Sequence, residues 1–213
     1  MRPMRYNPAS FAHGDLAACR EIIAAHPFGT LITSRGAEPL VTHCPMVWVQ
    51  DEHDPASAWI DGHIARPNTH HEHFDGGPAL ACFVGAHSYV SPTWYSERKN
   101  VPTWNYIAVH VTGTIERVDE LPARDAVLKR LIGHMEPSYI EHWQGLPEDY
   151  QQRMLGGIVG FRLRVQRVEG KFKLSQNRQP ADRDGVLAAM DRHAEQGDGD
   201  ARELAAWMRR LSG

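Results

Sequence analysis

The stretch "FGTLITSRGAEPLVTHCPMVWVQ", residues 28–50, decides the fold class. It holds two runs rich in β-branched and apolar residues, 28–34 and about 40–50, separated by Arg35-Gly36-Ala37-Glu38. Two such runs around a short turn with a glycine predict a β-hairpin. Pro45 interrupts the second run, which favours an edge strand, a bulge or a bend at that residue.

Other parts of the chain repeat this pattern. We expect further strands at about 58–63, 80–84, 107–116 and 161–166. In the last two, apolar and polar residues alternate with the period of a half-buried strand. The strands do not alternate with helices, which argues against a doubly wound fold. About six strands joined mostly by short turns predict a mainly β protein, a six-stranded antiparallel barrel rather than a sandwich.

Helices are expected around this barrel. Helical spacing of apolar residues predicts helices at 15–25, 121–135 and about 147–154, with one or two helical turns at 67–74 that begin at Pro67. Two further helices are expected near the C-terminus, separated by Gly197-Asp198-Gly199. We therefore expect a barrel domain over residues 1–180. A C-terminal helical extension over 181–213 would pack on the barrel or on a partner subunit.

Charge and cysteine content limit the possible partners and compartments. The net charge of −3 gives no electrostatic advantage for nucleic acid. Residues 182–213 hold seven acidic and five basic residues, whereas a recognition helix placed on phosphates should be basic. Three scattered cysteines without a CxxC pair favour a reducing compartment, and no apolar run is long enough for a signal peptide or a membrane span. We expect a cytosolic protein without a membrane anchor.

The stretch from Asp61 to His73 is a candidate anion site. A strand ends, Arg66 follows and a helical segment begins, so a guanidinium and backbone N–H groups are expected close together. His63 and Asn68 can add hydrogen bonds. A plain surface loop is the alternative. A metal site is not favoured, because no carboxylate or cysteine completes an evident ligand set with the histidines at 70, 71 and 73.

Three other segments are weaker candidates. Thr30 to Ser34 and the facing Thr42-His43 present hydroxyl groups suited to a flat polar ring, although threonine is common in strands. Trp104 and Asn105 begin a long strand, and Asn can donate to and accept from a heteroaromatic edge; core packing is the alternative for the tryptophan. The basic segment 171–178 would close over a bound anion or form a solvated loop.

Taken together, several of these pieces resemble one family. They are "HPFGTLITS", "THCPMVW", "GHIARPN", "AHSYVSPTWY", "VPTWNYIAVHVTG" and "FKLSQNR", in this order. The chain thus resembles the PaiB-type FMN-binding negative transcriptional regulators, over about residues 4–190. That family belongs to the FMN-binding split β-barrels, which are related to pyridoxamine-phosphate oxidases and to haem-degrading proteins.

The resemblance implies a six-stranded split barrel and a homodimer with FMN in a cleft between the subunits. It implies that the FMN phosphate meets the region from Arg66 to His71. Strand residues near 30–33 and 63–65 would face the flavin. Joined with the residues chosen above, the expected FMN site is Thr30, Leu31, Ile32, Thr33, His43, His63, Ile64, Ala65, Arg66, Asn68, His71, Trp104 and Asn105.

Three functions remain open at this stage. The first is a flavin-dependent redox protein or sensor, with an FMN-dependent oxidoreductase as its enzymatic form, although no acid–base dyad is evident. The second is a DNA-binding repressor, which the family name implies and the charge does not support. The third is a haem-binding or haem-degrading split-barrel protein, suggested by the thirteen histidines.

Overall fold

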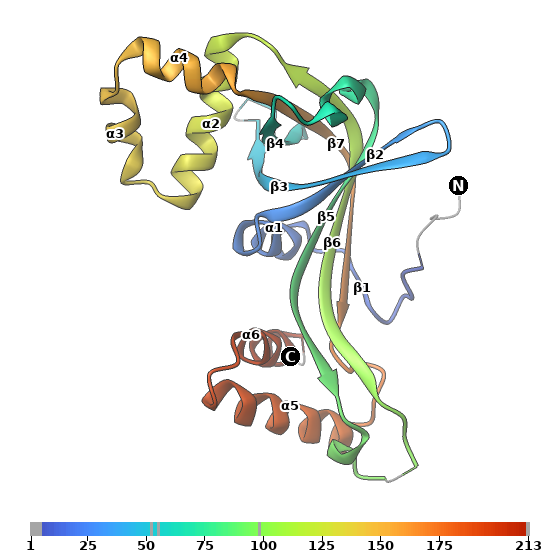
Figure 1. The fold of residues 1–213 in the computed structure, drawn as a ribbon. Helices are drawn as coiled ribbons and strands as arrows, with labels where there is room; N and C mark the ends of the chain where they lie inside the picture. Colours follow the sequence, from blue (N-terminus) through green and yellow to red (C-terminus); the bar gives the residue numbers. More distant parts are fainter. Residues whose placement is uncertain (1–5, 52, 55, 98, 212–213) are drawn as a thin grey trace. The chain divides into compact units, whose positions relative to one another are not determined.

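The computed structural model describes residues 6–51, 53–54, 56–97 and 99–211 (Figure 1). Within these ranges seven strands form one antiparallel sheet in the order β1-β7-β4-β3-β2-β5-β6. β6 also pairs with β7, and this pairing closes six strands into a ring. β1 (Ala12–His13) pairs with β7 outside the ring. The predicted six-stranded antiparallel barrel is confirmed, with β1 as a short addition.

The strands are longer than the sequence predicted. They are β2 (Phe28–Arg35), β3 (Glu38–Gln50), β4 (Ala58–Ala65), β5 (Asp75–Val90), β6 (Thr103–Val118) and β7 (Ile158–Lys173). The predicted segments 80–84, 107–116 and 161–166 are only the regularly patterned middles of the last three. The end segments of β5 and the C-terminal end of β7 contain glycines and polar or charged residues, and β6 begins with Thr103-Trp104-Asn105-Tyr106; in these segments the apolar and polar residues do not alternate as regularly.

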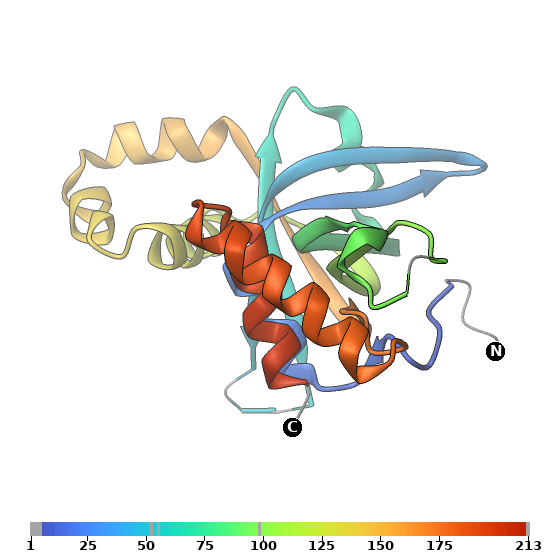
Figure 2. The same ribbon diagram turned by 90° about the horizontal axis from the view of Figure 1, so that it is seen from below.

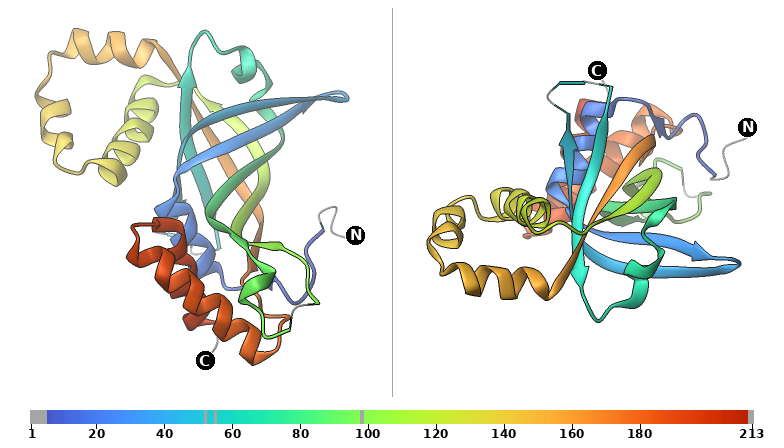
Figure 3. Two further views of the ribbon diagram at one scale, coloured as in Figure 1. Left: turned by 60° about the horizontal axis from the view of Figure 1, so that its bottom comes forward. Right: turned by 90° about the horizontal axis from the view of Figure 1, so that it is seen from above.

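The hairpin of residues 28–50 forms as expected. Arg35 pairs with Glu38, and Gly36 occupies the turn with a φ of 59°, a left-handed conformation that glycine adopts without strain. Figure 3 shows the two strands side by side along their length. Pro45 does not make β3 an edge strand. It pairs with Phe28 at the end of the β2 ladder, and the ladder to β4 begins at the next residue, Met46.

Two compact units share the three longest strands. Ile23–Phe83 and His110–Val168 form one, here called the hairpin unit. Met1–Ile22, Val84–Val109 and Glu169–Gly213 form the other, here called the terminal unit. The expected division of the chain at residue 180 stays a prediction. No helix among the described residues has both the length and the apolar composition to cross a membrane.

Three helices follow β6 in the hairpin unit: α2 (Leu121–Met135), α3 (Tyr139–Gly145) and α4 (Glu148–Gly156) (Figure 1). The sequence predicted α2 and α4 but not α3, which is too short for an apolar period to show. Val127 and Leu131 of α2 pack on Val47 of β3.

A buried ion cluster adds a polar contact between α2 and the sheet. Asp61 of β4 is fully buried. It pairs with Arg130 of α2 at 2.5 Å and with Arg162 of β7 at 3.1 Å. Burying a carboxylate without such partners would be costly, and the two guanidinium groups compensate for its burial.

The terminal unit contains α5 (Pro180–Glu195) and α6 (Gly199–Arg210), which lie along each other in Figure 2. Asp198 caps α6 by accepting a hydrogen bond from Ala201 N. The segment 197–199, which the sequence predicted to separate two helices, therefore lies between α5 and α6 and contains the first residue of α6. Trp207 of α6 meets Phe172 of β7 edge-on at 5.0 Å between ring centroids. The apolar face of α6 is thus buried within its own chain.

The remaining helical segments are short. α1 (Leu16–Ala25) matches the predicted first helix. The 3-10 helix η1 (Thr69–His73) begins after Asn68, so Pro67 precedes it rather than opening it. A second 3-10 turn, η2 (Pro92–Trp94), follows β5, and β6 begins only at Thr103. The sequence Pro-Thr-Trp occurs at 92–94 and again at 102–104, so its two copies flank the loop between β5 and β6.

Candidate functional site

Most of the predicted FMN-site residues lie in the hairpin unit. They come from β2, from the facing part of β3, from the end of β4 and from η1. Thr30 pairs with His43 in the ladder, and the Thr30 Oγ1 and His43 Nδ1 atoms are 3.0 Å apart. The prediction that these segments adjoin is therefore confirmed for β2 and β3.

His70, which the sequence analysis considered as a metal ligand and as part of the expected phosphate region, is the centre of a polar network. Its Nε2 lies 2.8 Å from Thr33 Oγ1, and its Nδ1 lies 2.8 Å from Thr42 Oγ1. Burial, and then the nearby His73, lower the pKa of His70, which favours the neutral ring. A neutral imidazole donates at one nitrogen and accepts at the other, and two hydroxyl groups satisfy both.

Asn68 extends this network from β3 into η1. Its Nδ2 donates to Thr42 Oγ1 at 3.1 Å, and its Oδ1 accepts from the backbone N–H of His70 at 3.0 Å. Both ends of the amide are thus engaged, which makes Asn68 a residue that positions η1. Within the described residues, no group of three His, Cys, Asp or Glu side chains is arranged to hold a metal ion.

Besides the predicted phosphate contact, the Arg66 side chain forms two hydrogen bonds to backbone carbonyls. Its Nε donates to the carbonyl of Gly156 at 2.5 Å, and its Nη2 donates to the carbonyl of Ile158 at 2.9 Å. These carbonyls lie at the end of α4 and the start of β7. Arg66 therefore fixes that junction, and its Nη1 forms no hydrogen bond with the described residues. The phosphate contact stays a prediction.

Two imidazoles near Arg66 have buried nitrogen atoms without a partner among the described residues. They are His63 Nδ1, on β4, and His71 Nδ1, in η1. Burial lowers the pKa of His63, so its ring is held neutral. Buried polar groups are normally hydrogen-bonded, so these two nitrogens, close to Arg66 in the sequence, are available to form a hydrogen bond with water or with a ligand. These residues fit the polar part of a flavin nucleotide.

The other predicted strand residues differ in what they can present. The side chains of Leu31 and Ile64 are buried in the core, so they can meet a ligand only through their backbone. Ile32 is half-buried and Ala65 is exposed at the end of β4. Each of these four contacts stays a prediction.

Trp104 and Asn105 belong to the terminal unit. The Trp104 side chain is 52% exposed and lies 6.1 Å from the ring of Tyr89, edge-on. Asn105 is fully buried; Ser175 Oγ donates to its Oδ1 at 3.1 Å, and its Nδ2 has no partner among the described residues. Their role in FMN binding stays a prediction.

Comparison with known proteins identifies the family. A family model described as "Putative FMN-binding domain" matches residues 5–167. The chain belongs to this FMN-binding family. The protease synthase and sporulation protein PAI 2 of Bacillus subtilis (strain 168) is 33% identical over 190 residues, which are 85% of this chain and 87% of that protein. The predicted family and its cofactor, FMN, are thereby confirmed.

Solved structures confirm the fold of this FMN-binding domain. The flavocytochrome Anf3 from Azotobacter vinelandii matches with a TM-score of 0.60 and 14% identity, over 76% of this chain and 69% of that one. The FAD and heme binding protein from Mycobacterium smegmatis matches with a TM-score of 0.59 and 14% identity, over 76% of this chain and 73% of that one. At this identity the likeness concerns the split-barrel fold alone.

Proposed function

We propose that this protein is a homodimeric flavin sensor of the PaiB regulator type, with FMN held by the hairpin unit. The observation that carries the FMN site is the pair of unpartnered imidazole nitrogens, His63 Nδ1 and His71 Nδ1, on either side of Arg66 in the sequence. They are polar atoms without a partner among the described residues, close to Arg66 in the sequence, in a chain that belongs to an FMN-binding family. The protein's work here is to bind and orient the flavin.

The bound isoalloxazine would supply electron transfer, the chemistry that is intrinsic to a flavin. The Arg66 guanidinium would offer its free Nη1 to the phosphate, while its other bonds hold it rigid. Neutral His63 would donate to, or accept from, a polar edge of the ligand. The network of His70, Thr33 and Thr42 would keep η1 in place beside them.

The homodimer is supported by exposed apolar side chains on β5 and β6. Tyr89 is 46% exposed and Trp104 is 52% exposed, and their rings lie 6.1 Å apart, edge-on, within the terminal unit. Large apolar groups gathered on one surface are typical of an interaction site. A second copy of the chain is the partner that we propose for this face.

The regulator role is supported by similarity to the PAI 2 protein, named for protease synthesis and sporulation. The charges on α5 and α6 do not favour direct binding of these helices to DNA. Arg209 pairs with Asp191 at 2.6 Å and Arg210 pairs with Glu21 at 2.6 Å, so the basic residues at the end of α6 are already neutralised. We therefore propose that the flavin state, rather than a basic helix, carries the signal.

The cytosol is the compartment that we propose. The three cysteines, all within the described residues, form no disulfide. Burial raises the pKa of Cys19 to about 11, with Asp15 adding to the effect, and burial raises the pKa of Cys44 to about 12. Such thiols stay protonated and unreactive at neutral pH.

The test begins with the purified protein. FMN should be released on denaturation, and the apoprotein should bind FMN more tightly than FAD, with a mass in light scattering of two chains. Anaerobic mixing with NADH or NADPH then asks whether either donor bleaches the flavin, and a mobility shift with the protein's own upstream DNA, near 50 mM salt, asks for DNA binding. A colourless protein that binds haem but not FMN would overturn the proposal.

A further inference from the structure

The basic segment 171–178, which the FMN proposal does not use, lines a small polar pocket in the terminal unit. The pocket measures about 30 Å³ and is lined by Thr103, Asn105, Lys173, Ser175, Asn177 and Arg178. Every lining residue is polar, and two carry a positive charge. A volume of this size is close to one water's share of the liquid, so it admits one oxygen of a ligand headgroup rather than a whole ligand.

The pocket contains a buried hydrogen-bond donor, the side-chain amide of Asn105. Asn105 has 0% exposure, and Ser175 Oγ occupies its Oδ1 at 3.1 Å, which orients the amide. Its Nδ2 has no hydrogen-bond partner among the described residues. An unsatisfied amide N–H₂ in the interior costs about 1–3 kcal/mol. A ligand oxygen accepting from Nδ2 would remove that cost.

The local charge favours an anionic oxygen. Lys173 donates to Thr103 Oγ1 and to the carbonyl of Trp104, both neutral acceptors. Burial lowers the pKa of Lys173, and Arg178 and Lys171 lower it further. The cations thus repel one another, and an anion between them would relieve this repulsion.

A carboxylate that interacts with Arg178, Asp182, is engaged elsewhere. Asp182, at the start of α5, accepts from Ser96 N at 2.8 Å and from Ser96 Oγ at 2.7 Å. These two hydrogen bonds lower its pKa, and Arg178 contributes at longer range. Asp182 is not among the residues that line the pocket. Its carboxylate instead holds the loop after η2 through the two hydrogen bonds from Ser96.

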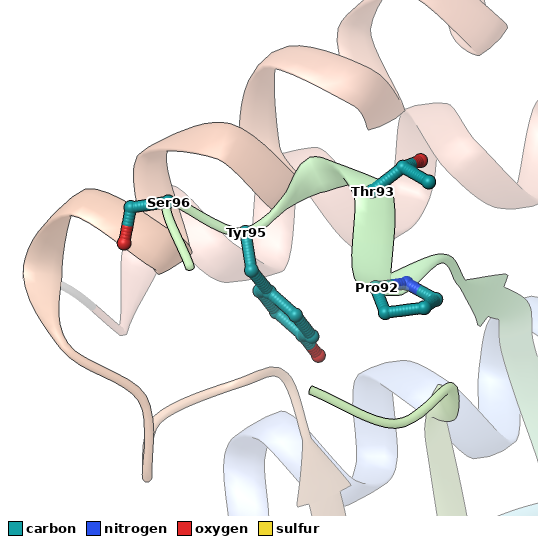
Figure 4. A pocket seen from close by; sticks show the side chains of 4 residues that line it. All are labelled: Pro92, Thr93, Tyr95 and Ser96. Carbon is teal, nitrogen blue, oxygen red and sulfur yellow. The ribbon is translucent and has the colours of Figure 1, made fainter. Parts of the chain in front are cut away.

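A larger hollow of about 530 Å³ lies beside that loop, lined by Pro92, Thr93, Tyr95 and Ser96 (Figure 4). Its size is that of a small-molecule site. In Figure 4 the Tyr95 side chain points away from the backbone of the loop, with its hydroxyl at the far end. That hydroxyl is buried and has no partner among the described residues.

Arg178 connects the two spaces. Its guanidinium carbon lies 4.5 Å from the centre of the Tyr95 ring, and its Nη1 donates to Asn100 Oδ1 at 2.9 Å. The same side chain lines the polar pocket. The guanidinium is therefore held by the hydrogen bond to Asn100 and by stacking on the Tyr95 ring.

We propose that the terminal unit binds a small molecule bearing an oxyanion, a phosphate or a carboxylate. Asn105, Lys173 and Arg178 receive the anionic group, and the body of the molecule lies in the hollow beside Tyr95. The site contains none of the residues assigned to FMN around Arg66, although Asn105 belongs to the expected FMN set. The anion has two possible sources: a free metabolite, or the phosphate of FMN itself, which would then meet this pocket instead of Arg66.

The first experiment measures binding of inorganic phosphate to the apoprotein by calorimetry at constant ionic strength. Wild type should bind phosphate saturably, with a dissociation constant of about 1 mM or lower. Arg178→Gln and Lys173→Gln should each weaken binding about tenfold or more, because each removes a charged donor. Lys99→Gln is the matched control, since Lys99 is exposed on the neighbouring loop and the charge change is the same.

The second experiment distinguishes the two sources. Phosphate titration is repeated on protein saturated with FMN, and FMN affinity is compared with riboflavin affinity in wild type and in Arg178→Gln. Phosphate binding that survives FMN saturation identifies a separate anion. Loss of phosphate binding, with Arg178→Gln weakening FMN but not riboflavin, identifies the phosphate of FMN. Either result supports the site.

Circular dichroism shows which variants fold. Lys173 donates hydrogen bonds to Thr103 and to the carbonyl of Trp104, so Lys173→Gln is the variant whose folding is more at risk. Arg178 is only half-buried, so Arg178→Gln should disturb folding less. The proposal is overturned if folded wild type shows no saturable phosphate binding and Arg178→Gln leaves the preference for FMN over riboflavin unchanged. It is also overturned if folded Arg178→Gln binds phosphate as wild type does.

Discussion

Asp61 and Arg130 join β4 to α2 through two contacts to one buried oxygen. Arg130 Nη2 lies 2.5 Å from Asp61 Oδ2 and Arg130 Nε donates to the same oxygen at 2.8 Å. Asp61 has no exposure, whereas the Arg130 side chain is 34% exposed. The pair is therefore anchored at the fully buried carboxylate of Asp61.

Asp61→Asn should lower the free energy of unfolding by about 3 kcal/mol, because the substitution leaves Arg130 and Arg162 half-buried without their counter-charge. Urea unfolding of wild type and variant measures the difference. Asp191→Asn is the control: it breaks the exposed pair with Arg209 and should cost less than about 1 kcal/mol. Equal effects of the two variants would contradict the structural role of the buried cluster.

Gly113→Ala should destabilise the barrel where β6 approaches β7. A Cβ at Gly113 would lie 1.8 Å from the carbonyl oxygen of Arg164, and a backbone atom cannot turn away as a side chain can. We expect a loss of about 3 kcal/mol or more in thermal or urea unfolding. Gly145→Ala, where no atom lies within 4 Å of the added methyl, should be nearly neutral. A neutral Gly113→Ala would mean that the two strands are farther apart than the structure has them.

Stability should fall as the pH drops below about 6.5. Burial lowers the pKa of His63 and of His70 from 6.5 in the folded chain. The unfolded chain then binds more protons than the folded chain, so this stabilisation is complete above pH 6.5 and is lost as the pH falls toward the folded pKa values. Each histidine adds a slope of at most about 1.4 kcal/mol per pH unit.

Urea unfolding between pH 8 and pH 5.5 measures this slope. His70→Gln removes one titrating group and should flatten the curve, at the cost of one hydrogen bond in the threonine network. His53→Gln, on an exposed loop residue, should leave the slope as it is in wild type. A slope unchanged by His70→Gln would show that His70 does not contribute.

Arg66→Gln should weaken FMN binding by about 1.5–3 kcal/mol if the guanidinium meets the phosphate. The variant also loses two bonds to the carbonyls of Gly156 and Ile158, so it should unfold more easily as well. Riboflavin separates the two effects, because it lacks the phosphate. Its affinity should change little in the variant, whereas an equal loss for riboflavin and FMN would assign Arg66 a structural role alone. Arg164→Gln, which breaks an exposed pair with Glu116, is the matched control.

The candidate site was predictable in part. The sequence indicated β2, the facing residues of β3 and the segment after β4, because turn and strand signals are local. It did not predict that His70 would lie between two threonine hydroxyls, since Thr33 and Thr42 are far from it in the chain and meet it only through the sheet. Nor did it predict the hydrogen bonds of Arg66 to the carbonyls of Gly156 and Ile158, which lie about ninety residues away in the chain.

The sequence by itself determined the strands, most helices and the family, since alternation, turn residues and the PaiB-type pieces are readable along the chain. Only the tertiary structure decided which polar atoms are satisfied. His70 and Asn68 proved to have their partners, whereas His63 Nδ1, His71 Nδ1 and Asn105 Nδ2 have none among the described residues. The physical reason is that hydrogen bonding and burial depend on contacts between distant segments, which closure of the barrel creates and local periodicity does not encode.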